Sequence, residues 1–245
     1  MRVAINGAAG RMGMLLVADV MEAEDLVLAG ATDAAEGFPS PAPGVLDDAQ
    51  VVIDFSLPEG TEALLDCLVR EMPLVIGTTG LGPSVGEAIE ERGTRAPIVL
   101  ASNFSTGITL LNSLVARAAA TLPDFHVEIV EMHHEFKRDA PSGTALTLGR
   151  AVADARDEEL GRLAVHGRLG ETGIRSDEEI GFHALRGGDI SGEHTVYLAG
   201  PGERLKLAHL ATSRQAFASG ALRAARWVVG RPPGLYDMRD VLGLR

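Results

Sequence analysis

Residues 3–13 read VAINGAAGRMG, and this stretch decides the fold. A short apolar run over 3–5 leads at once into three glycines, Gly7, Gly10 and Gly13, followed by residues with a helical pattern. Glycines let the backbone turn sharply and approach a pyrophosphate, which then binds free N–H groups at the start of a helix. The spacing is G-x-x-G-x-x-G rather than the commoner G-x-G-x-x-G, so the turn alone also fits an ordinary strand-to-helix turn.

Asp33 strengthens the dinucleotide interpretation. It follows a second strand predicted over 26–29 and stands 20 residues after Gly13, where an acidic side chain can bind ribose hydroxyls. The alternative is a tight turn with a solvated aspartate beyond it. If the interpretation holds, the turn residues that contact the dinucleotide are Gly7, Ala8, Ala9, Gly10, Arg11 and Met12.

The first hundred residues alternate short apolar runs with helical patterns. Runs that are apolar nearly throughout are typical of a parallel sheet covered by helices on both faces, so we predict a doubly wound α/β domain. Three prolines in residues 38–44 predict a surface loop after the second strand. The predicted strands span residues 3–5, 26–29, 51–55, 74–76 and 98–100, and the predicted helices span 11–22, 61–71 and 84–92.

Two further turns follow the fourth and fifth strands of this domain. Ligands bind outside the carboxyl ends of parallel strands, so both turns are candidates for contact with the nicotinamide end of a dinucleotide. Taken singly, each is equally compatible with an ordinary loop. The candidate residues are Gly77, Thr78 and Thr79 in one turn, and Ala101, Ser102, Asn103 and Phe104 in the other.

The pattern changes after residue 104. Alternating apolar and polar residues over 180–185, 195–198 and 205–208 predict a mixed or antiparallel sheet with one solvated face. We expect a dinucleotide-binding domain of residues 1–104 and 213–245, and a second domain of residues 105–212. The other predicted elements are helices over 109–120, 144–155 and 222–229, a strand over 127–130, and an acidic irregular stretch over 157–179.

Composition excludes several classes of protein. The 245 residues carry 22 Lys and Arg against 34 Asp and Glu, a net charge of −12, which argues against a nucleic-acid partner. The single cysteine, Cys67, excludes an intrachain disulfide and a Cys-based zinc site, and its apolar surroundings favour packing over reactivity. No stretch predicts a membrane span or a signal peptide, so we expect a cytoplasmic protein.

The densest polar block reads EMHHEFKRDAPSGTA, residues 131–145. Its H-E-x-x sequence continues with Arg138 where a zinc protease has histidine, and no other cluster offers metal geometry, so we expect no metal site. What remains is a cationic, proton-donating patch that leads into a helix start at Ser142–Thr144, where free N–H groups suit a carboxylate. The alternative is a solvated charged loop.

The block resembles the active-site signature E-x-H-H-x-x-K-x-D-x-P-S-G-T-A of the 4-hydroxy-tetrahydrodipicolinate (dihydrodipicolinate) reductase family. The glycine turn is also similar to the segment of that family, and the resemblance extends from residue 3 to about residue 240. Other matching segments, in the same order, are residues 52–56, 77–80, 101–104, 186–194 and 213–214.

The resemblance implies an N-terminal Rossmann domain that the C-terminal helix rejoins, and a smaller α+β domain whose open mixed sheet builds a homotetramer. It also implies an NAD(P)H-dependent oxidoreductase that reduces a cyclic 2,6-dicarboxylate on the diaminopimelate route to lysine. By matching position, His133 is the general acid/base, Lys137 is the proton donor, and His134, Gly143 and Thr144 bind substrate.

The choice between NADH and NADPH depends on the residues after the second strand. Ala34 stands where several relatives carry a basic residue, and the Asp33 carboxylate would repel a 2′-phosphate. Arg11 is the one nearby base that favours NADPH. We therefore expect both cofactors to be used, with NADH favoured.

Two other functions compete with this one. Another two-domain Rossmann oxidoreductase would explain residues 1–103 but not the block at 131–145. A dinucleotide-binding regulator without turnover would have no need for the pair of His133 and Lys137.

Overall fold

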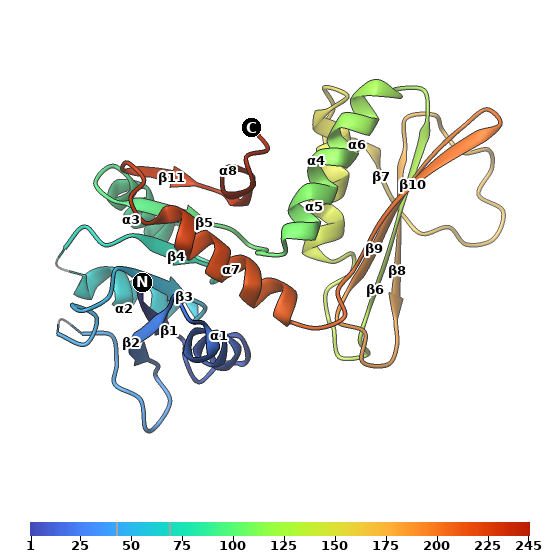
Figure 1. The fold of residues 1–245 in the computed structure, drawn as a ribbon. Helices are drawn as coiled ribbons and strands as arrows, with labels where there is room; N and C mark the ends of the chain where they lie inside the picture. The colour runs from blue at the N-terminus through green and yellow to red at the C-terminus, as the bar shows by residue number, and fades with distance from the viewer. Residues whose placement is uncertain (43, 69) are drawn as a thin grey trace. The chain divides into compact units, whose positions relative to one another are not determined.

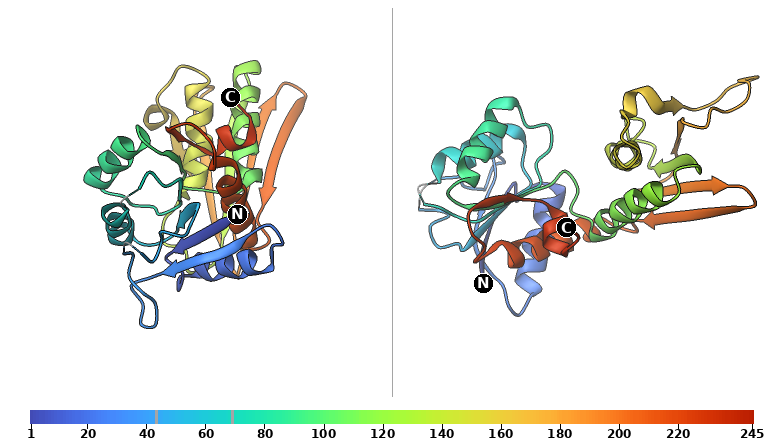
Figure 2. Two further views of the ribbon diagram at one scale, coloured as in Figure 1. Left: turned by 60° about the vertical axis from the view of Figure 1, so that its left-hand side comes forward. Right: turned by 90° about the horizontal axis from the view of Figure 1, so that it is seen from above.

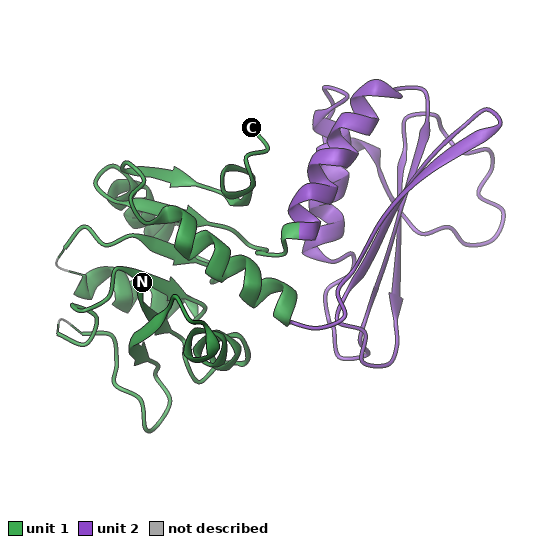
Figure 3. Cartoon of the chain, viewed as in Figure 1, with its two compact units in different colours: residues 1–106, 215–245 green, residues 107–214 purple. Residues whose placement is uncertain are grey.

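The computed structural model describes residues 1–42, 44–68 and 70–245, which form two compact units (Figure 3). Unit 1 consists of Met1–Thr106 together with Gln215–Arg245, and unit 2 consists of Gly107–Arg214. Unit 2 is therefore an insertion in unit 1, and both chain termini belong to unit 1 (Figure 3). Pro43 of the predicted proline-rich loop and Val69 of the helix predicted over 61–71 lie outside the described residues.

Unit 1 is built on a six-stranded sheet in which every strand pair is parallel. Its strands run in the order β11-β5-β4-β3-β1-β2. Strand β2 lies on one side of β1, and β3, β4, β5 and β11 follow one another on the other side. This order confirms the predicted doubly wound Rossmann-like sheet. The strands are β1 (Arg2–Asn6), β2 (Val27–Thr32), β3 (Val51–Asp54), β4 (Leu74–Ile76), β5 (Pro97–Leu100) and β11 (Gly234–Tyr236).

Helices cover both faces of this sheet (Figure 1). Alternate strand residues point to opposite faces, so Ile5 and Ile53 pack in one core while Ala4 and Val52 pack in the other. The first core is closed by α1 (Arg11–Glu22), α7 (Gln215–Val228) and α8 (Met238–Leu242), and the second by α2 (Pro58–Cys67) and α3 (Pro83–Gly93).

Unit 2 is built on a five-stranded mixed sheet in the order β10-β9-β6-β8-β7. The central strand β6 pairs parallel with β8 and antiparallel with β9, and Figure 2 shows β9 and β10 as a long hairpin. One face packs against the helices of the unit. The elements are β6 (His126–His133), β7 (Ala164–His166), β8 (Ile180–Arg186), β9 (Glu193–Gly200), β10 (Glu203–Leu210), α4 (Thr106–Thr121), α5 (Gly143–Asp154) and α6 (Leu160–Leu163).

Several elements differ from those predicted. The acidic stretch over 157–179 is not wholly irregular, because it contains α6 and β7, and the prediction also lacked β11 and α8. Helix α7 begins at Gln215, seven residues before the predicted start, and its first two turns read QAFASGA, in which Gly220 and several small residues obscured the helical pattern. These small residues allow close packing: a Cβ on Gly220 would lie 1.8 Å from the carbonyl oxygen of Phe104.

Candidate active site

The glycine turn joins β1 to α1 in a conformation that larger residues would block. Gly7 has a φ of +81°, and a Cβ on Gly13 would lie only 2.0 Å from the carbonyl oxygen of Gly7. The turn is anchored to β2, because the N–H groups of Gly7 and Ala8 both donate to the carbonyl oxygen of Thr32 at 2.9 and 3.0 Å. The backbone of the turn is therefore held at the carboxyl edge of the sheet.

The start of α1 suits an anion. Gly10 is its N-cap, no side chain among the described residues caps its first turn, and that turn carries no acidic residue. Uncapped N–H groups and the positive end of the helix dipole favour a phosphate. This part of unit 1 therefore fits the pyrophosphate of a dinucleotide.

Asp33 follows β2 directly and lies against the turn. Its Oδ2 accepts a hydrogen bond from the N–H of Ala9 at 2.8 Å, and its Oδ1 accepts one from the N–H of Ala35 at 2.9 Å. The carboxylate is therefore fixed in place, while Ala34 and Ala35 beside it are exposed.

The loops after β4 and β5 lie at the same edge of the sheet as the glycine turn. Strand register places Asn6 beside Asp54, Asp54 beside Ile76, and Ile76 beside Leu100. Phe55 was not predicted as a site residue, yet its ring packs on Gly77, where a Cβ would lie 2.4 Å away, and 5.3 Å from the ring of Phe104. The structure thus brings the loop residues Gly77, Thr78, Thr79, Ala101, Ser102, Asn103 and Phe104 to one edge.

A buried carboxylate ties this edge together. Asp54 is 0% exposed, and the side chains that donate to it within the described ranges are all neutral. The donors belong to β1, to the turn after β3, to α2 and to the loop after β4, so Asp54 links the glycine turn to the loop at Thr78. They are Asn6 Nδ2 at 2.8 Å, Ser56 Oγ at 2.6 Å, Thr61 Oγ1 at 2.6 Å and Thr78 Oγ1 at 2.9 Å.

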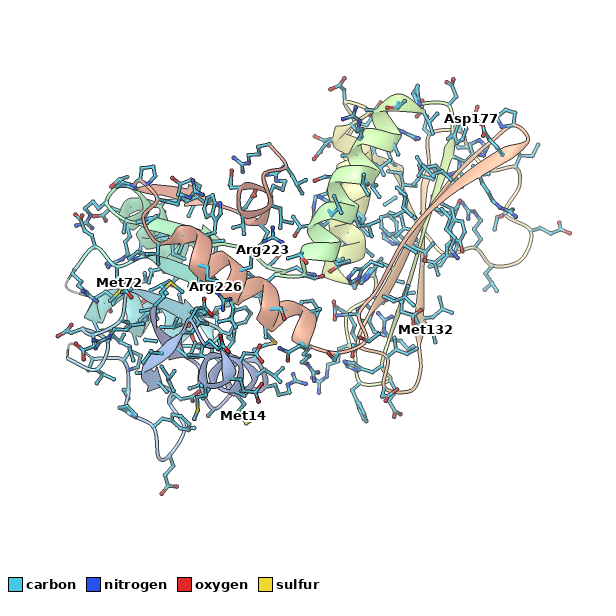
Figure 4. The ribbon with its side chains drawn as sticks, in the orientation of Figure 1. Met14, Met72, Met132, Asp177, Arg223 and Arg226 are labelled. Atoms are coloured by element: carbon cyan, nitrogen blue, oxygen red, sulfur yellow. The ribbon has the colours of Figure 1, made fainter. Side chains whose placement is uncertain are left out.

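In unit 2, strand β6 carries Glu131 and His133 on its buried face. Residues two apart on a strand share a face, and Met132 between them, labelled in Figure 4, belongs to the opposite face. Glu131 is 1% exposed and His133 is 8% exposed. His133 Nδ1 lies 2.5 Å from Glu131 Oε2.

Glu131 is held by two further groups. Arg186, at the end of β8, donates from both Nη atoms to its two oxygens at 2.9 Å, and the N–H of Ser142 donates to Oε1 at 3.0 Å. Sequence reasoning missed Glu131, Ser142 and Arg186 as site residues. The available signal was the two-residue spacing of Glu131 and His133, which places both on one face of a strand.

Burial and charge set the protonation of these groups. Burial opposes ionisation of Glu131, but the hydrogen bonds from Arg186 and His133 outweigh it and hold the pKa of Glu131 below its ordinary value. Burial lowers the pKa of His133, against the opposing effect of Glu131. His194 on β9 lies next to His133, with ring centroids 5.1 Å apart, and burial lowers the pKa of His194 to about 4.

Lys137 lies in the turn that follows β6. The N–H of His134 donates to the carbonyl oxygen of Ile190 at 2.9 Å, and the N–H of Lys137 donates to the carbonyl oxygen of His134 at 3.2 Å. The Lys137 ammonium forms an ion pair with Asp139 at 2.9 Å, and its hydrogen bond lowers the pKa of Asp139. This turn keeps a cation close to the buried Glu131–His133 pair.

The turn ends in a helix start that fits the expected carboxylate receptor. Ser142 caps α5, with its Oγ accepting from the N–H of Ala145 at 3.2 Å, and it also lies 2.9 Å from His194 Nε2. Gly143 is exposed and Thr144 is half-buried in the first turn. His134 Nδ1 is buried without a hydrogen-bond partner among the described residues.

The structure therefore brings His133, His134, Lys137, Gly143 and Thr144 together through one turn of unit 2. Among the described residues, no group of three or more His, Cys, Asp or Glu side chains could hold a metal ion. No helix in the described part of the chain is long and apolar enough to cross a membrane.

Two family models match the chain. One, described as "Dihydrodipicolinate reductase, N-terminus", covers residues 1–104, and the other, "Dihydrodipicolinate reductase, C-terminus", covers residues 107–242. A curated relative from Halorhodospira halophila, named 4-hydroxy-tetrahydrodipicolinate reductase, is 46% identical over 99% of this chain and 98% of its own. A relative of the same name from Alkalilimnicola ehrlichii is 47% identical, with 99% of each chain covered.

Solved structures agree with these matches. A dipicolinate-bound dihydrodipicolinate reductase from Paenisporosarcina is similar over 97% of both chains, with a TM-score of 0.75 and 28% identity. A DAP dehydrogenase from C. glutamicum in complex with DAP has a TM-score of 0.54 at 14% identity, covering 97% of this chain and 92% of that one. The second likeness shows the fold alone.

Proposed function

The chain belongs to the dihydrodipicolinate reductase family, and from this premise we propose how its residues divide the work of the reaction. It is an NAD(P)H-dependent oxidoreductase that reduces 4-hydroxy-tetrahydrodipicolinate to tetrahydrodipicolinate on the diaminopimelate route to L-lysine. The observation that carries the residue assignment is the buried Glu131–His133 pair beside Lys137 and the start of α5.

Proton transfer is the task of the block in unit 2. A dinucleotide held by the glycine turn would supply a hydride to C4 of the conjugated ring that is left once the 4-hydroxyl group has departed as water, and a proton must then neutralise the negative charge on the ring system. We assign His133, at the end of β6, as the general acid/base and Lys137, in the turn that follows, as the proton donor, because both stand at the positions of the family signature. Cationic groups positioned before the reaction stabilise such charge without reorganisation.

We assign substrate recognition to the turn that follows β6 and to the start of α5. The first-turn N–H groups at Gly143 and Thr144 suit one carboxylate of a cyclic 2,6-dicarboxylate. The Lys137 ammonium and Nδ1 of His134, which has no hydrogen-bond partner in the described part of the chain, supply further polar contacts. A dipicolinate-bound relative supports this assignment, since dipicolinate is a planar ring with the same two carboxylates.

Cofactor binding is assigned to unit 1. We propose that Gly7, Ala8, Ala9, Gly10, Arg11 and Met12 hold the pyrophosphate, that Asp33 binds the adenosine ribose, and that the loops at Gly77–Thr79 and Ala101–Phe104 contact the nicotinamide end. The uncapped start of α1 and the shared edge of these loops support the assignment.

We further propose that the enzyme uses both cofactors and favours NADH. The Asp33 carboxylate is fixed by two backbone N–H groups, so it cannot easily move away from a 2′-phosphate. Exposed Ala34 and Ala35 provide no compensating cation. Arg11 is exposed at the start of α1 and supplies the charge that still allows NADPH to bind.

We propose that unit 2 assembles four chains into a homotetramer. All helices of the unit pack on one face of its sheet, so the face that carries Thr195 and Tyr197 has no helix over it among the described residues. The edge strand β10 is largely exposed and includes Leu210 at 60% exposure. Open sheet faces and edges favour pairing with another chain. A cytoplasmic location also stays a prediction, supported by the biosynthetic role.

A coupled assay tests the function. The preceding synthase generates the unstable cyclic substrate in the cuvette, and nicotinamide oxidation is followed by absorbance. We expect turnover that depends on the synthase product and competition by pyridine-2,6-dicarboxylate. Nicotinamide oxidation that is independent of this product would favour another Rossmann oxidoreductase, and dinucleotide binding with no turnover would favour a regulator.

A further inference from the structure

We propose that Glu131 is a positioning residue that keeps hydrogen on His133 Nδ1, so that Nε2 is the atom that exchanges the proton with substrate. This inference rests on the proposed function and deepens it, because it names the group that determines which nitrogen acts.

The hydrogen-bond donors around Glu131 determine its state. Oε1 accepts from the N–H of Ser142 at 3.0 Å and from Arg186 at 2.9 Å, and Oε2 accepts from Arg186 at 2.9 Å. A backbone N–H and a guanidinium can only donate, and because their hydrogen bonds outweigh burial and lower the pKa of Glu131, the carboxylate is ionised near pH 7. His133 Nδ1, 2.5 Å from Oε2, must then be the donor in that contact.

The other nitrogen of His133, Nε2, lies next to a glycine, which has no side chain to cover it. A Cβ on Gly192 would lie 3.0 Å from His133 Nε2, and Gly192 has a φ of +151°, where side-chain-bearing residues are strained. Any larger residue at this position would cover Nε2. The arrangement therefore holds Nδ1 against a fixed anion and leaves the space beside Nε2 free of a side chain from position 192.

The charged groups around His133 act in opposite directions. Glu131 on its own strand favours the imidazolium, whereas Arg186 on β8 and Lys137 in the following turn disfavour it. His194 on β9 also faces His133, and it is neutral near pH 7 because burial lowers its pKa to about 4. Removing Glu131 or Arg186 should therefore move the titration of His133 in opposite directions.

The substitution Glu131→Gln should reverse the tautomer. If the new NH2 group took the place of Oε1, it would face the N–H of Ser142 and Arg186, neither of which can accept. If it took the place of Oε2, it would face Arg186 and His133, and only His133 can adapt, by moving its hydrogen to Nε2. Nε2, the nitrogen proposed to exchange the proton with substrate, would then already carry hydrogen in the neutral ring and could not accept one.

The test compares Glu131→Gln with Glu128→Gln. Glu128 is on the same strand and also lies between arginines and a histidine, with His183 Nε2 at 2.7 Å, but it points to the other face. We expect Glu131→Gln to lower kcat about 100-fold or more while KM changes less than about threefold. The alkaline limb of its kcat–pH profile should move to lower pH, and that of Arg186→Gln to higher pH. In Glu128→Gln the alkaline limb should stay where it is in the wild type. Light scattering should report the same mass for this variant as for the wild type.

A second readout needs no turnover. Nitrogen-15 NMR of histidine-labelled protein, with the His133 signals assigned through His133→Gln, reports the tautomer directly. We expect Nδ1–H in the wild type and Nε2–H in Glu131→Gln. An Nε2–H tautomer in the wild type, or more than half of wild-type kcat with an unmoved pH limb in Glu131→Gln, would overturn the inference. If the wild type reduces no cyclic dicarboxylate, the proposed function fails, and the NMR result still decides the role of Glu131.

Discussion

At the scale of single residues, two adjacent histidines have different surroundings. His133 is buried on the helix-covered face of β6 and bonded to Glu131, whereas His134 is half-buried in the turn and its Nδ1 has no partner among the described residues. A histidine held by a carboxylate is oriented for proton transfer, whereas a buried ring nitrogen with no partner among the described residues would be satisfied by a hydrogen bond to a ligand. The division of roles proposed for the two residues follows from this difference.

Replacing His133 by Gln, or Lys137 by Ala, should lower kcat by about 10²–10⁴-fold, because general acid catalysis contributes that much. Dinucleotide affinity should stay within about twofold, since the residues assigned to the cofactor lie in unit 1. Steady-state kinetics and a fluorescence titration with NADH measure the two effects. Arg138→Ala, an exposed neighbour in the same turn, is the control. Retention of more than half of wild-type turnover in both variants would refute the assigned roles.

The wild type should favour NADH over NADPH about tenfold in kcat/KM, which corresponds to about 1.4 kcal/mol. Asp33→Ala removes the fixed carboxylate and should narrow or reverse this preference. Arg11→Ala should weaken NADPH more than NADH, since only NADPH carries the 2′-phosphate. Kinetics with both nucleotides for all three proteins decide the matter, and a clear wild-type preference for NADPH would contradict the role of Asp33.

Sequence alone located the acid/base candidates but not the groups that control them. His133 and Lys137 stand in a fifteen-residue block that has a distinctive pattern of charged residues, so they can be identified locally. Arg186 lies 55 residues after Glu131 in the chain, and its contact exists only because β6 pairs with β8. No spacing rule links residues that a sheet brings together.

At the scale of elements, strands and helices with a strong apolar pattern were predictable, including the three-residue β4, whereas the elements that were missed are both short and weakly patterned. Helix α1 has the predicted bounds, whereas β7 and β11 have three residues each and α6 has four. Such short elements form because neighbouring strands or helices hold them, as β5 holds β11. Their local sequence carries too few alternations to show a period.

Asp54→Asn should loosen the elements that this carboxylate joins. An amide NH2 in place of Oδ1 would face the donating Nδ2 of Asn6, and in place of Oδ2 it would face the hydroxyls of Thr61 and Thr78. We expect a loss of about 1–3 kcal/mol in the free energy of unfolding and weaker dinucleotide binding. Urea unfolding and an NADH titration measure both. Exposed Asp66→Asn on α2 is the control, and equal behaviour of the two variants would contradict the linking role of Asp54.

His194, which joins β9 to the cap of α5, should make unit 2 sensitive to acid. Burial lowers its pKa from 6.5 to about 4, so the unfolded chain binds its proton more readily and stability is lost as pH falls below about 6.5. The loss from this group between pH 7 and pH 5 is about 2 kcal/mol. Thermal unfolding at pH 7 and pH 5 should show that the melting temperature falls less between the two pH values for His194→Gln than for the wild type. An equal decrease in both would contradict this source of acid sensitivity.

At the scale of the whole molecule, assembly should depend on the uncovered face of the unit 2 sheet. Light scattering of the wild type should report close to four times the 25.7 kDa of one chain. Thr195→Arg places a charge on that face and should reduce the mass of the assembly, because burying an unpaired charge between chains destabilises their association. Thr121→Arg, exposed at the end of α4, is the matched control. A wild-type monomer at micromolar concentration would refute the tetramer.

The insertion of unit 2 within unit 1 has a consequence for how a ribosome delivers this protein. Helix α7 supplies Ala218, Ala221 and Val228, each fully buried, to a core whose strands lie in the first hundred residues. Residues 1–106 emerge first, yet that core stays open until α7 is translated, roughly 5–20 s later at ordinary elongation rates. Unit 2 is complete before that point. The second segment to be synthesised is therefore the first that can fold, and the nascent dinucleotide-binding sheet needs shielding from other chains until its C-terminal helix arrives.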